Sequence, residues 1–485
     1  MTVPQNNLPP WIQWENVMAH AETHSTRSLV ASPNSVDECL GVIDFATRRK
    51  LSICPRGAGY SYGDIILNDN QIVLNLRRMN KICSWCPESG RISAEPGATL
   101  GDLLFISMPF NWTVNACPGG AGVTVGGAVS NNIHGKDSWK SGNFGDSVIS
   151  LKLLISSGEI LTIDRTVDRQ LIEAVISGMG VLGIVVEIAL QLAKIPSPFI
   201  EVSVTPVKNT QEMMEKIEES RGKFDSFTGW TDAFSKGEML GRGCVSAARW
   251  IDVPMAMSKK RLAKSLEEPT RVLNLFPQRP AWFVLNKIFH PSLMGLANFF
   301  QYQVFKASHV LFSSKMPQML FTEYNFMFNR LPGWPKLFHP YGYIEFQPMI
   351  PRKSGFEAIE EIYRICQRHG FPSLMCGVKA HKKDDYMLSY SGDGYSMGID
   401  IHFKSRDRER ISRLGRDVFE YVLDCGGTTY LAKDLLLPRD LFERMYPRYK
   451  EFLEVKERLD PSNLFQSDMY RRLLEPVSSL MRSRG

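Results

Sequence analysis

The chain has 485 residues, of which 44% are hydrophobic and 22% charged, and its formal net charge is +6. This length exceeds what one hydrophobic core supports, so two or three domains are expected, and the composition excludes a disordered or repetitive chain. Lys and Arg are dispersed rather than clustered in a basic patch, so nucleic-acid binding is not predicted. The nine cysteines lack the spacing of a disulfide framework, which indicates a reducing compartment. They also lack paired CxxC motifs, so no metal site is predicted.

The N-terminal sequence "MTVPQNNLPPWIQWENV" lacks the basic start and apolar run of a secretory signal, which predicts a cytoplasmic protein. The most apolar stretch, residues 281–305, is interrupted by Lys287, His290 and Pro291. It therefore falls short of the roughly 18 uninterrupted apolar residues of a spanning helix. This stretch suits either peripheral contact with a membrane surface or packing between domains.

Helices and strands alternate along the first 195 residues, which is typical of an α+β fold. The pattern predicts a helix over 35–50, strands over 51–57 and 71–76, a strand and a helix over 91–107, and strands over 147–163 and 182–195.

The pattern changes after Pro196. It predicts a strand, a helix and a strand over 199–234, an irregular aromatic-rich region over 274–340, strands over 342–350, 373–381 and 396–403, and a helix over 356–370. This arrangement predicts a sheet with helices on one face. A last helix is expected to end at Gly426-Gly427, before a short strand.

Residues 178–183 form a literal G-x-G-x-x-G. A Rossmann site requires a strand before this motif and a helix after it, whereas here a helical pattern precedes it and "IVVEIAL" follows. We interpret residues 178–183 as a tight turn where backbone approaches a ligand.

Two further segments are rich in glycine. The first is "PRGAGYSYGD" (55–64), and the second spans residues 118–148 and contains His-Gly-Lys, followed by "DSWKSGNFGDSV". Glycine permits positive φ and lets amide N–H groups converge on an anion, so these segments could hold the two phosphates of one pyrophosphate. Two ordinary surface turns are the alternative interpretation.

Five motifs in order along the chain, "PRGAGYSYGD", "VTVGGAVSNNIHGK", "GMGVLGIVVEI", "YLAKD" and "LDPSNLFQSDM", resemble the flavoenzymes of the vanillyl-alcohol oxidase superfamily. The similarity is greatest to the branch that acts on polyprenylphosphoryl sugars. It implies a two-subdomain FAD-binding fold formed by residues 1–195 and 426–485. An α+β substrate-binding cap domain on an antiparallel sheet would occupy residues 196–425.

The resemblance also implies the site residues. The residues that would bind FAD are Arg56, Gly57, Gly59, Ser61, Tyr62, Gly63, Thr124, Gly126, Gly127, Asn131, His134, Gly135, Gly180, Gly183, Ile184, Tyr430 and Lys433. Gly180, Gly183 and Ile184 would line the adenine side. The residues that would contact substrate are Lys136, Trp230, Glu345, Gln347, Lys379 and Ser396. Where the resembled branch has Asn and Cys, this chain has Ser396 and Gly398, so the pocket floor is altered.

Lys433, His134 and Tyr430 are the expected catalytic residues. A cation near N1 and O2 of the flavin favours its reduced anionic form, and a lysine with a pKa lowered by burial can also take up a hydroxyl proton. The alternatives are a surface lysine paired with Asp434 and a structural histidine. Many relatives attach FAD covalently through a histidine at the position of Tyr60, so non-covalent FAD is expected.

The resemblance implies oxidation of a secondary sugar hydroxyl, at C2 of a polyprenylphosphoryl-β-D-ribose, by hydride transfer to flavin N5. This would be the first half of an epimerisation to the arabinose form for cell-wall synthesis, completed by a short-chain dehydrogenase/reductase. Peripheral contact with the inner face of the membrane is a further expectation. Two alternatives stay open: an oxygen-using sugar-alcohol or aldonolactone oxidase, and a flavin-binding scaffold without turnover.

Overall fold

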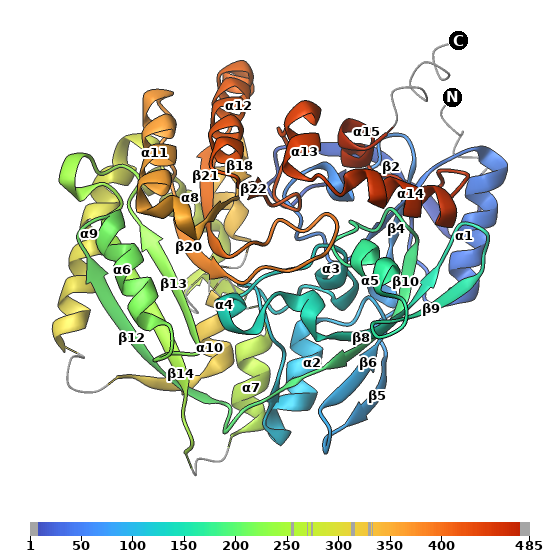
Figure 1. The fold of residues 1–485 in the computed structure, drawn as a ribbon, viewed down its shortest axis with the longest axis horizontal. Coiled ribbons are helices and arrows are strands. Elements are labelled where there is room, and N and C mark those ends of the chain that lie inside the picture. The colour runs from blue at the N-terminus through green and yellow to red at the C-terminus, as the bar shows by residue number, and fades with distance from the viewer. Residues whose placement is uncertain are drawn as a thin grey trace.

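The computed structural model describes residues 8–253, 257–268, 270–272, 275–311, 316–327, 331 and 333–475. Figure 1 shows two halves side by side. One half carries the blue and teal N-terminal elements with the red C-terminal helices above them. The other half, coloured green to orange, contains a large sheet flanked by helices.

Two sheets form the core of the N-terminal half. In the first, of order β1-β2-β4-β3, β1 is antiparallel to β2 and the other pairs are parallel. The second is antiparallel, with the order β5-β6-β10-β8-β9. The strands are β1 (Ile12–Met18), β2 (Ser25–Ala31), β3 (Ile53–Arg56), β4 (Ile72–Asn75), β5 (Ile82–Cys86), β6 (Arg91–Ala94), β8 (Val148–Leu154), β9 (Ile160–Asp164) and β10 (Ile184–Gln191), beside a short pair of β7 (Trp112–Thr113) and β11 (Ala193–Lys194).

Capping residues define the starts of the two main helices in this half. The hydroxyl of Ser35 accepts a hydrogen bond from the Glu38 amide at the start of α1 (Val36–Arg49). Thr99 and Asp102 form a capping box at the start of α2 (Leu100–Ser107). Shorter helices follow at α3 (Val125–Ser130), α4 (Ser138–Ser141) and α5 (Arg169–Val175).

The large sheet is antiparallel and has the order β17-β12-β14-β13-β20-β21-β19-β22, with β18 also paired to β21. The strands are β12 (Phe199–Val207), β13 (Ser226–Thr231), β14 (Gly243–Trp250), β17 (Gln318–Leu320), β18 (Tyr343–Phe346), β19 (Pro348–Pro351), β20 (Cys376–His381), β21 (Gly394–His402) and β22 (Thr428–Thr429). The segment 342–350, expected as one strand, is thus split at Gln347, whose side chain takes part in the site described below.

Helices α6 (Thr210–Ser220), α11 (Gly355–Arg368) and α12 (Arg408–Asp424) cover one face of this sheet (Figure 1). Phe346 of β18 packs edge-on against Phe419 of α12, with ring centroids 5.5 Å apart. Because side chains alternate across a strand, Glu345 points to the opposite face. The registers place Glu345 opposite Asp400 and Lys379 opposite Ser396 on that face.

The C-terminal helices α13 (Arg439–Met445), α14 (Tyr449–Leu459) and α15 (Asp468–Leu473) return to the N-terminal half (Figure 1). The Ile53 amide donates to the Leu464 carbonyl at 2.7 Å, and Phe465 is buried in the core around β3 and β4. Chain ends far apart in sequence therefore share one core.

The expectation of an irregular region over 274–340 is wrong for most of its described residues. They contain β16 (Phe276–Pro277), which pairs with β15 (Arg271–Val272), then α8 (Gln278–Ile288), α9 (Pro291–Leu311), α10 (Phe321–Asn325) and a 3-10 helix η8 (Trp334–Phe338), after α7 (Lys259–Leu266). Pro291 starts α9 rather than interrupting a helix, because the first helical turn needs no N–H from it. Across the described segments, no helix is long and apolar enough to span a bilayer.

Candidate active site

The two glycine-rich loops lie against each other. A Cβ built on Gly57 would meet the Thr124 Oγ1 at 2.1 Å, so only glycine fits at this approach. A Cβ built on Gly126 would lie 2.7 Å from the Pro96 Cβ. The neighbouring Val125 amide donates to the Ala98 carbonyl at 2.8 Å. The loop after β3 and the start of α3 thus form one surface lined by backbone.

The G-x-G-x-x-G segment follows α5 and precedes β10, which confirms that it is a turn and not a Rossmann motif. Gly180 has φ +75°, a conformation that favours glycine. Ser177 and Met179 donate their amides to the carbonyls of Val129 and Ser130, at 3.1 and 2.8 Å. All three glycine-rich segments therefore meet around α3.

This surface fits FAD in two respects. The close approaches bring the two loops together with no intervening side chain, which lets their backbone amide groups converge on an anion such as a pyrophosphate. In addition, Asn131 donates its Nδ2 to the Gly127 carbonyl at 2.9 Å, while its Oδ1 is buried and has no hydrogen-bond partner. A buried acceptor of this kind normally has a donor, so it is suited to a bound ligand. The first glycine-rich segment also carries Arg56, Gly59 and Ser61, and the second carries Gly135.

Lys433 meets the first of these loops from the far end of the chain. Tyr62 donates its amide to the Ala432 carbonyl at 3.0 Å, and the absent Cβ of Gly63 would lie 1.8 Å from the Asp434 carbonyl. The Lys433 Nζ stands 3.0 Å from the centre of the Tyr62 ring and 3.0 Å from Glu345 Oε2. Burial lowers the pKa of Lys433, and the negative charge of Glu345 opposes that shift.

Asp400 completes this charged group and was not predicted from the sequence. Burial, and then the negative charge of Glu345 opposite it, raise the pKa of Asp400 well above its usual value. Both effects disfavour the ionised form of Asp400, and Glu345, 3.0 Å from the Lys433 Nζ, is the carboxylate paired with Lys433. The available signal was the alternation of β21, where Ser396, Gly398 and Asp400 share one face.

His134 sits between the sheet and the loop that follows α3. Its Nε2 lies 2.8 Å from Gln347 Nε2 and its Nδ1 lies 3.4 Å from Lys379 Nζ. Burial lowers the pKa of His134 well below its usual value, and the charge of Lys379 adds to this shift. The imidazole is neutral, so only one ring nitrogen can accept. If Lys379 donates to Nδ1, then Nε2–H donates and the Gln347 amide must turn its oxygen toward it.

Two tyrosines join these residues to the loop that follows α3. Tyr430 donates its hydroxyl to the Asn131 carbonyl at 2.9 Å, and its ring stacks on Tyr390 with centroids 4.5 Å apart. Beside them, His381 Nε2 lies 2.7 Å from Ser396 Oγ. Burial lowers the pKa of His381 to about 3, so this pair is uncharged.

Other predicted residues lie further along the same region. Lys136 donates to the Tyr324 carbonyl at 2.9 Å and stands 3.9 Å from the centre of the Tyr324 ring, so α10 surrounds its ammonium group. Trp230 is half-buried, and its ring lies 5.4 Å from Phe305 of α9. These contacts give both residues local partners outside the network of Lys433 and His134. Ile184 is fully buried in β10 and Gly183 approaches the Leu154 carbonyl.

The fold and this site define a FAD-binding oxidoreductase. The "FAD binding domain" family profile matches residues 28–164, and the "D-arabinono-1,4-lactone oxidase" profile matches residues 340–473. The chain is a FAD-dependent oxidoreductase that acts on CH–OH groups, and its fold is of the vanillyl-alcohol oxidase type.

Similarity to individual proteins extends over most of the chain. It is 26% identical to decaprenylphosphoryl-beta-D-ribose oxidase of Mycolicibacterium smegmatis, over 87% of this chain and 89% of that protein. It is 23% identical to L-gulonolactone oxidase of Mus musculus, over 89% and 92%. It is 21% identical to L-gulono-1,4-lactone dehydrogenase of Mycobacterium tuberculosis, over 96% and 100%.

Proposed function

We propose that the chain oxidises a secondary hydroxyl of a lipid-linked pentose, C2 of a polyprenylphosphoryl-β-D-ribose, to a keto sugar. The observation that carries this proposal is the convergence of Lys433, from the end of the chain, with the first glycine-rich loop through Tyr62. The similarity to a decaprenylphosphoryl-ribose oxidase supports the choice of sugar. Lys379, whose pKa burial lowers to about 8, supplies a cation on the same face of the sheet for an anionic substrate.

FAD, when bound, supplies the hydride acceptor. We assign the proton transfer to Lys433, because burial lowers its pKa and so eases release of the ammonium proton to solvent, after which the amine can take the hydroxyl proton as the carbon loses hydride. Once protonated, Lys433 is a cation balanced by Glu345. His134 stays neutral and is oriented from both sides by Lys379 and Gln347, and Tyr430 fixes the loop at Asn131.

The remaining assignments follow from this proposal. Residues 1–195 and 426–485 would bind FAD and residues 196–425 would bind substrate, and the contact of Ile53 with Leu464 and Phe465 supports the joining of the two outer parts. FAD would be bound non-covalently, since Tyr60 occupies the attachment position. A short-chain dehydrogenase/reductase would reduce the keto sugar to the arabinose form, at the membrane where the lipid carrier resides.

Anaerobic mixing of the purified protein with candidate sugars tests the substrate. We expect a polyprenylphosphoryl ribose to bleach the flavin colour, and acid precipitation of the protein to release the yellow dye. Retention of the dye in the acid precipitate would reject non-covalent binding. Failure of every lipid-linked pentose to bleach the flavin would reject the proposed substrate class.

The second candidate function is an aldonolactone oxidase. It is favoured by the lactone oxidase profile over residues 340–473 and by the similarity to gulonolactone oxidases. Steady peroxide formation from free lactones or alditols in air, with no bleaching by a lipid-linked sugar, would support this second candidate.

A further inference from the structure

Helix α9 is attached to the protein by one side only. Its inward residues make specific contacts: Asn298 donates to Asp232 Oδ1 at 2.9 Å, Phe305 packs on Trp230, and His309 Nδ1 lies 2.9 Å from the Val204 carbonyl. The spacing of these residues is that of a single helix face. This side of α9 is therefore docked on the large sheet, on the face that carries Glu345 and Lys379.

The opposite side of α9 is also apolar and faces solvent. Leu296, Phe300 and Val304 recur at four-residue intervals and are 57%, 59% and 58% exposed. The preceding helix α8 also exposes apolar side chains, since Phe283 and Val284 are 71% and 57% exposed. We call these five residues the α8–α9 apolar face. A contiguous exposed apolar surface on a soluble protein usually marks an interaction site.

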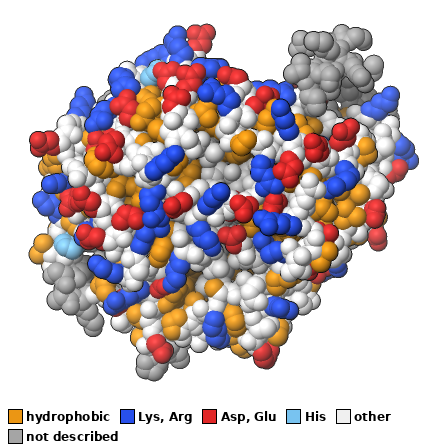
Figure 2. Space-filling model, in the orientation of Figure 1, with side chains coloured by type: hydrophobic (Ala, Val, Ile, Leu, Met, Phe, Trp, Pro, Cys, Tyr) orange, Lys and Arg blue, Asp and Glu red, His pale blue; other side chains and the backbone are white. Residues whose placement is uncertain are grey.

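The charges in the sequence of this segment have one sign. Between Glu268 and Glu323 the sequence contains no Asp or Glu, and the described basic side chains of this segment include Arg271, Lys287 and Lys306. Lys306 stands 5.9 Å from the ring centre of Tyr302 on α9, and Lys287 stands 5.6 Å from that of Phe283 on α8. The face shown in Figure 2 has Lys and Arg intermixed with Asp and Glu.

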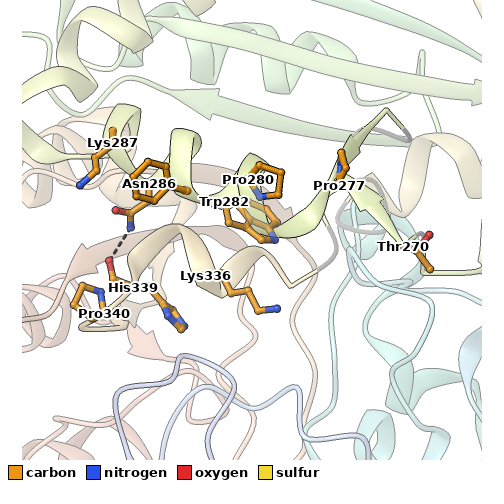
Figure 3. A pocket seen from close by; sticks show the side chains of 10 residues that line it. Thr270, Pro277, Pro280, Trp282, Asn286, Lys287, Lys336, His339 and Pro340 are labelled. Carbon is orange, nitrogen blue, oxygen red and sulfur yellow. Dashed lines mark hydrogen bonds between the residues drawn. The ribbon is translucent and has the colours of Figure 1, made fainter.

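A groove of about 800 Å³ opens beside α8, between this helix and η8 (Figure 3). Phe283 and Lys287 of α8 line it together with Trp282, Lys336 and His339. Trp282 belongs to the same buried aromatic cluster as Trp334 and Tyr62, and Tyr62 contacts Lys433. The groove therefore lies between the α8–α9 apolar face and the cluster next to the candidate active site.

We propose that the α8–α9 apolar face docks on an anionic lipid bilayer, with Lys287 and Lys306 at the headgroups and the apolar side chains below them. Exposed apolar side chains flanked by basic ones are the pattern of an interfacial helix. A second copy of the chain would bring like charges together, whereas an anionic surface complements them. The inference rests on the proposed function in one respect, since a lipid-linked substrate resides in the bilayer that this face would contact.

Co-sedimentation of the FAD-loaded protein tests the proposal, with vesicles of equal parts phosphatidylglycerol and phosphatidylcholine or of phosphatidylcholine alone. We expect the protein to bind the mixed vesicles. The double variant Leu296→Ser/Phe300→Ser should bind at least tenfold more weakly. Lys287→Gln/Lys306→Gln should reduce binding to the mixed vesicles and leave binding to phosphatidylcholine unchanged. Phe110→Ser, which changes a 49% exposed residue of the N-terminal half, is the matched control and should bind as the parent does.

Equal binding by the parent and the serine double variant would overturn the proposal. Light scattering that shows a dimer of the parent and a monomer of that variant would also overturn it, in favour of a protein interface. Vesicle binding needs no turnover. If the protein binds vesicles but no lipid-linked sugar bleaches the flavin, only the proposed substrate is rejected. If the sugar bleaches the flavin and the protein does not bind vesicles, only the docking surface is rejected.

Discussion

At the scale of single residues, the site is governed by the cost of burying charge. Lys433, Glu345 and Asp400 share one buried space, and their protonation states depend on each other. Because the ionised form of Asp400 is disfavoured, the charged pair at this place is Lys433 and Glu345. Removing either member of such a pair leaves an uncompensated buried charge, which costs more than the pair contributes.

The substitution Lys433→Met should therefore lower both stability and the rate of flavin reduction. Loss of the partner of Glu345 is expected to cost about 3–5 kcal/mol of unfolding free energy, and loss of the proton acceptor about 10²–10⁴-fold in reduction rate. The double variant Lys433→Met/Glu345→Gln should regain stability and stay slow. Urea unfolding and stopped-flow reduction measure the two effects separately. Full turnover by either variant would reject the catalytic assignment.

Asp384 gives a second prediction at this scale. It accepts hydrogen bonds from Asn132 at 2.8 Å and Ser389 at 2.9 Å, and burial raises its pKa to about 7. An unfolded aspartate ionises near pH 3.9, so between about pH 4 and 7 the native state holds a proton that the unfolded state has lost. This group therefore makes stability fall as pH rises through that range, with no further change above it.

Asp384→Asn should remove this part of the pH dependence, which urea midpoints recorded at several pH values between 4 and 8 would detect. Asp385→Asn is the control, because the Asp385 side chain is 64% exposed and its pair with Arg169 spans 3.7 Å. An unchanged slope in the Asp384 variant would show that the buried carboxyl is ionised throughout.

At the scale of elements, the close approach of two loops is the feature that glycine allows. Gly57→Ala should weaken FAD retention at least tenfold, because its methyl group would overlap the Thr124 hydroxyl. In the Thr124→Ala background the same change should have little effect, since the nearest remaining side-chain atom, the Thr124 Cβ, lies 3.4 Å away. Flavin fluorescence during titration with FAD measures the four affinities. Gly41→Ala on α1 is the control, as its Cβ would meet nothing within 4 Å.

Equal effects of Gly57→Ala in both backgrounds would mean that steric overlap with Thr124 is not the cause. In that case the backbone conformation at Gly57, rather than the contact between the loops, would determine FAD binding.

The sequence predicted elements whose pattern is local. The helix at α1, the alternating strands β8 to β10 and the G-x-G-x-x-G turn were predicted because capping residues and periodicity act within a few residues. It did not predict α9, because a proline inside an apolar run looks like an interruption until its place in the first turn is known. Asp400 was missed because its role depends on the register of β18 on β21, and that pairing is non-local.

At the scale of the whole molecule, the guanidinium group of Arg472 connects the C-terminal part of the chain to the N-terminal half. Arg472 of α15 donates to Asp64, the last residue of the first glycine-rich segment, at 2.8 and 2.9 Å. It also donates to Asp434, next to Lys433, at 2.9 Å. The Asp64 and Asp434 side chains are 7% and 1% exposed. Arg472 thus sets the position of the loop relative to the lysine that approaches it.

Arg472→Met should leave two buried carboxylates close together, at a cost of about 3–5 kcal/mol of unfolding free energy. Because the contact positions the FAD loop, FAD affinity should fall with stability. Saturating FAD should then restore part of the loss, about 2.7 kcal/mol at a hundredfold excess over Kd. Urea unfolding with and without added FAD measures both quantities. Arg458→Met, at an exposed position of α14, is the matched control. An Arg472 variant that loses stability but binds FAD as the parent does would show that this contact supports the fold alone.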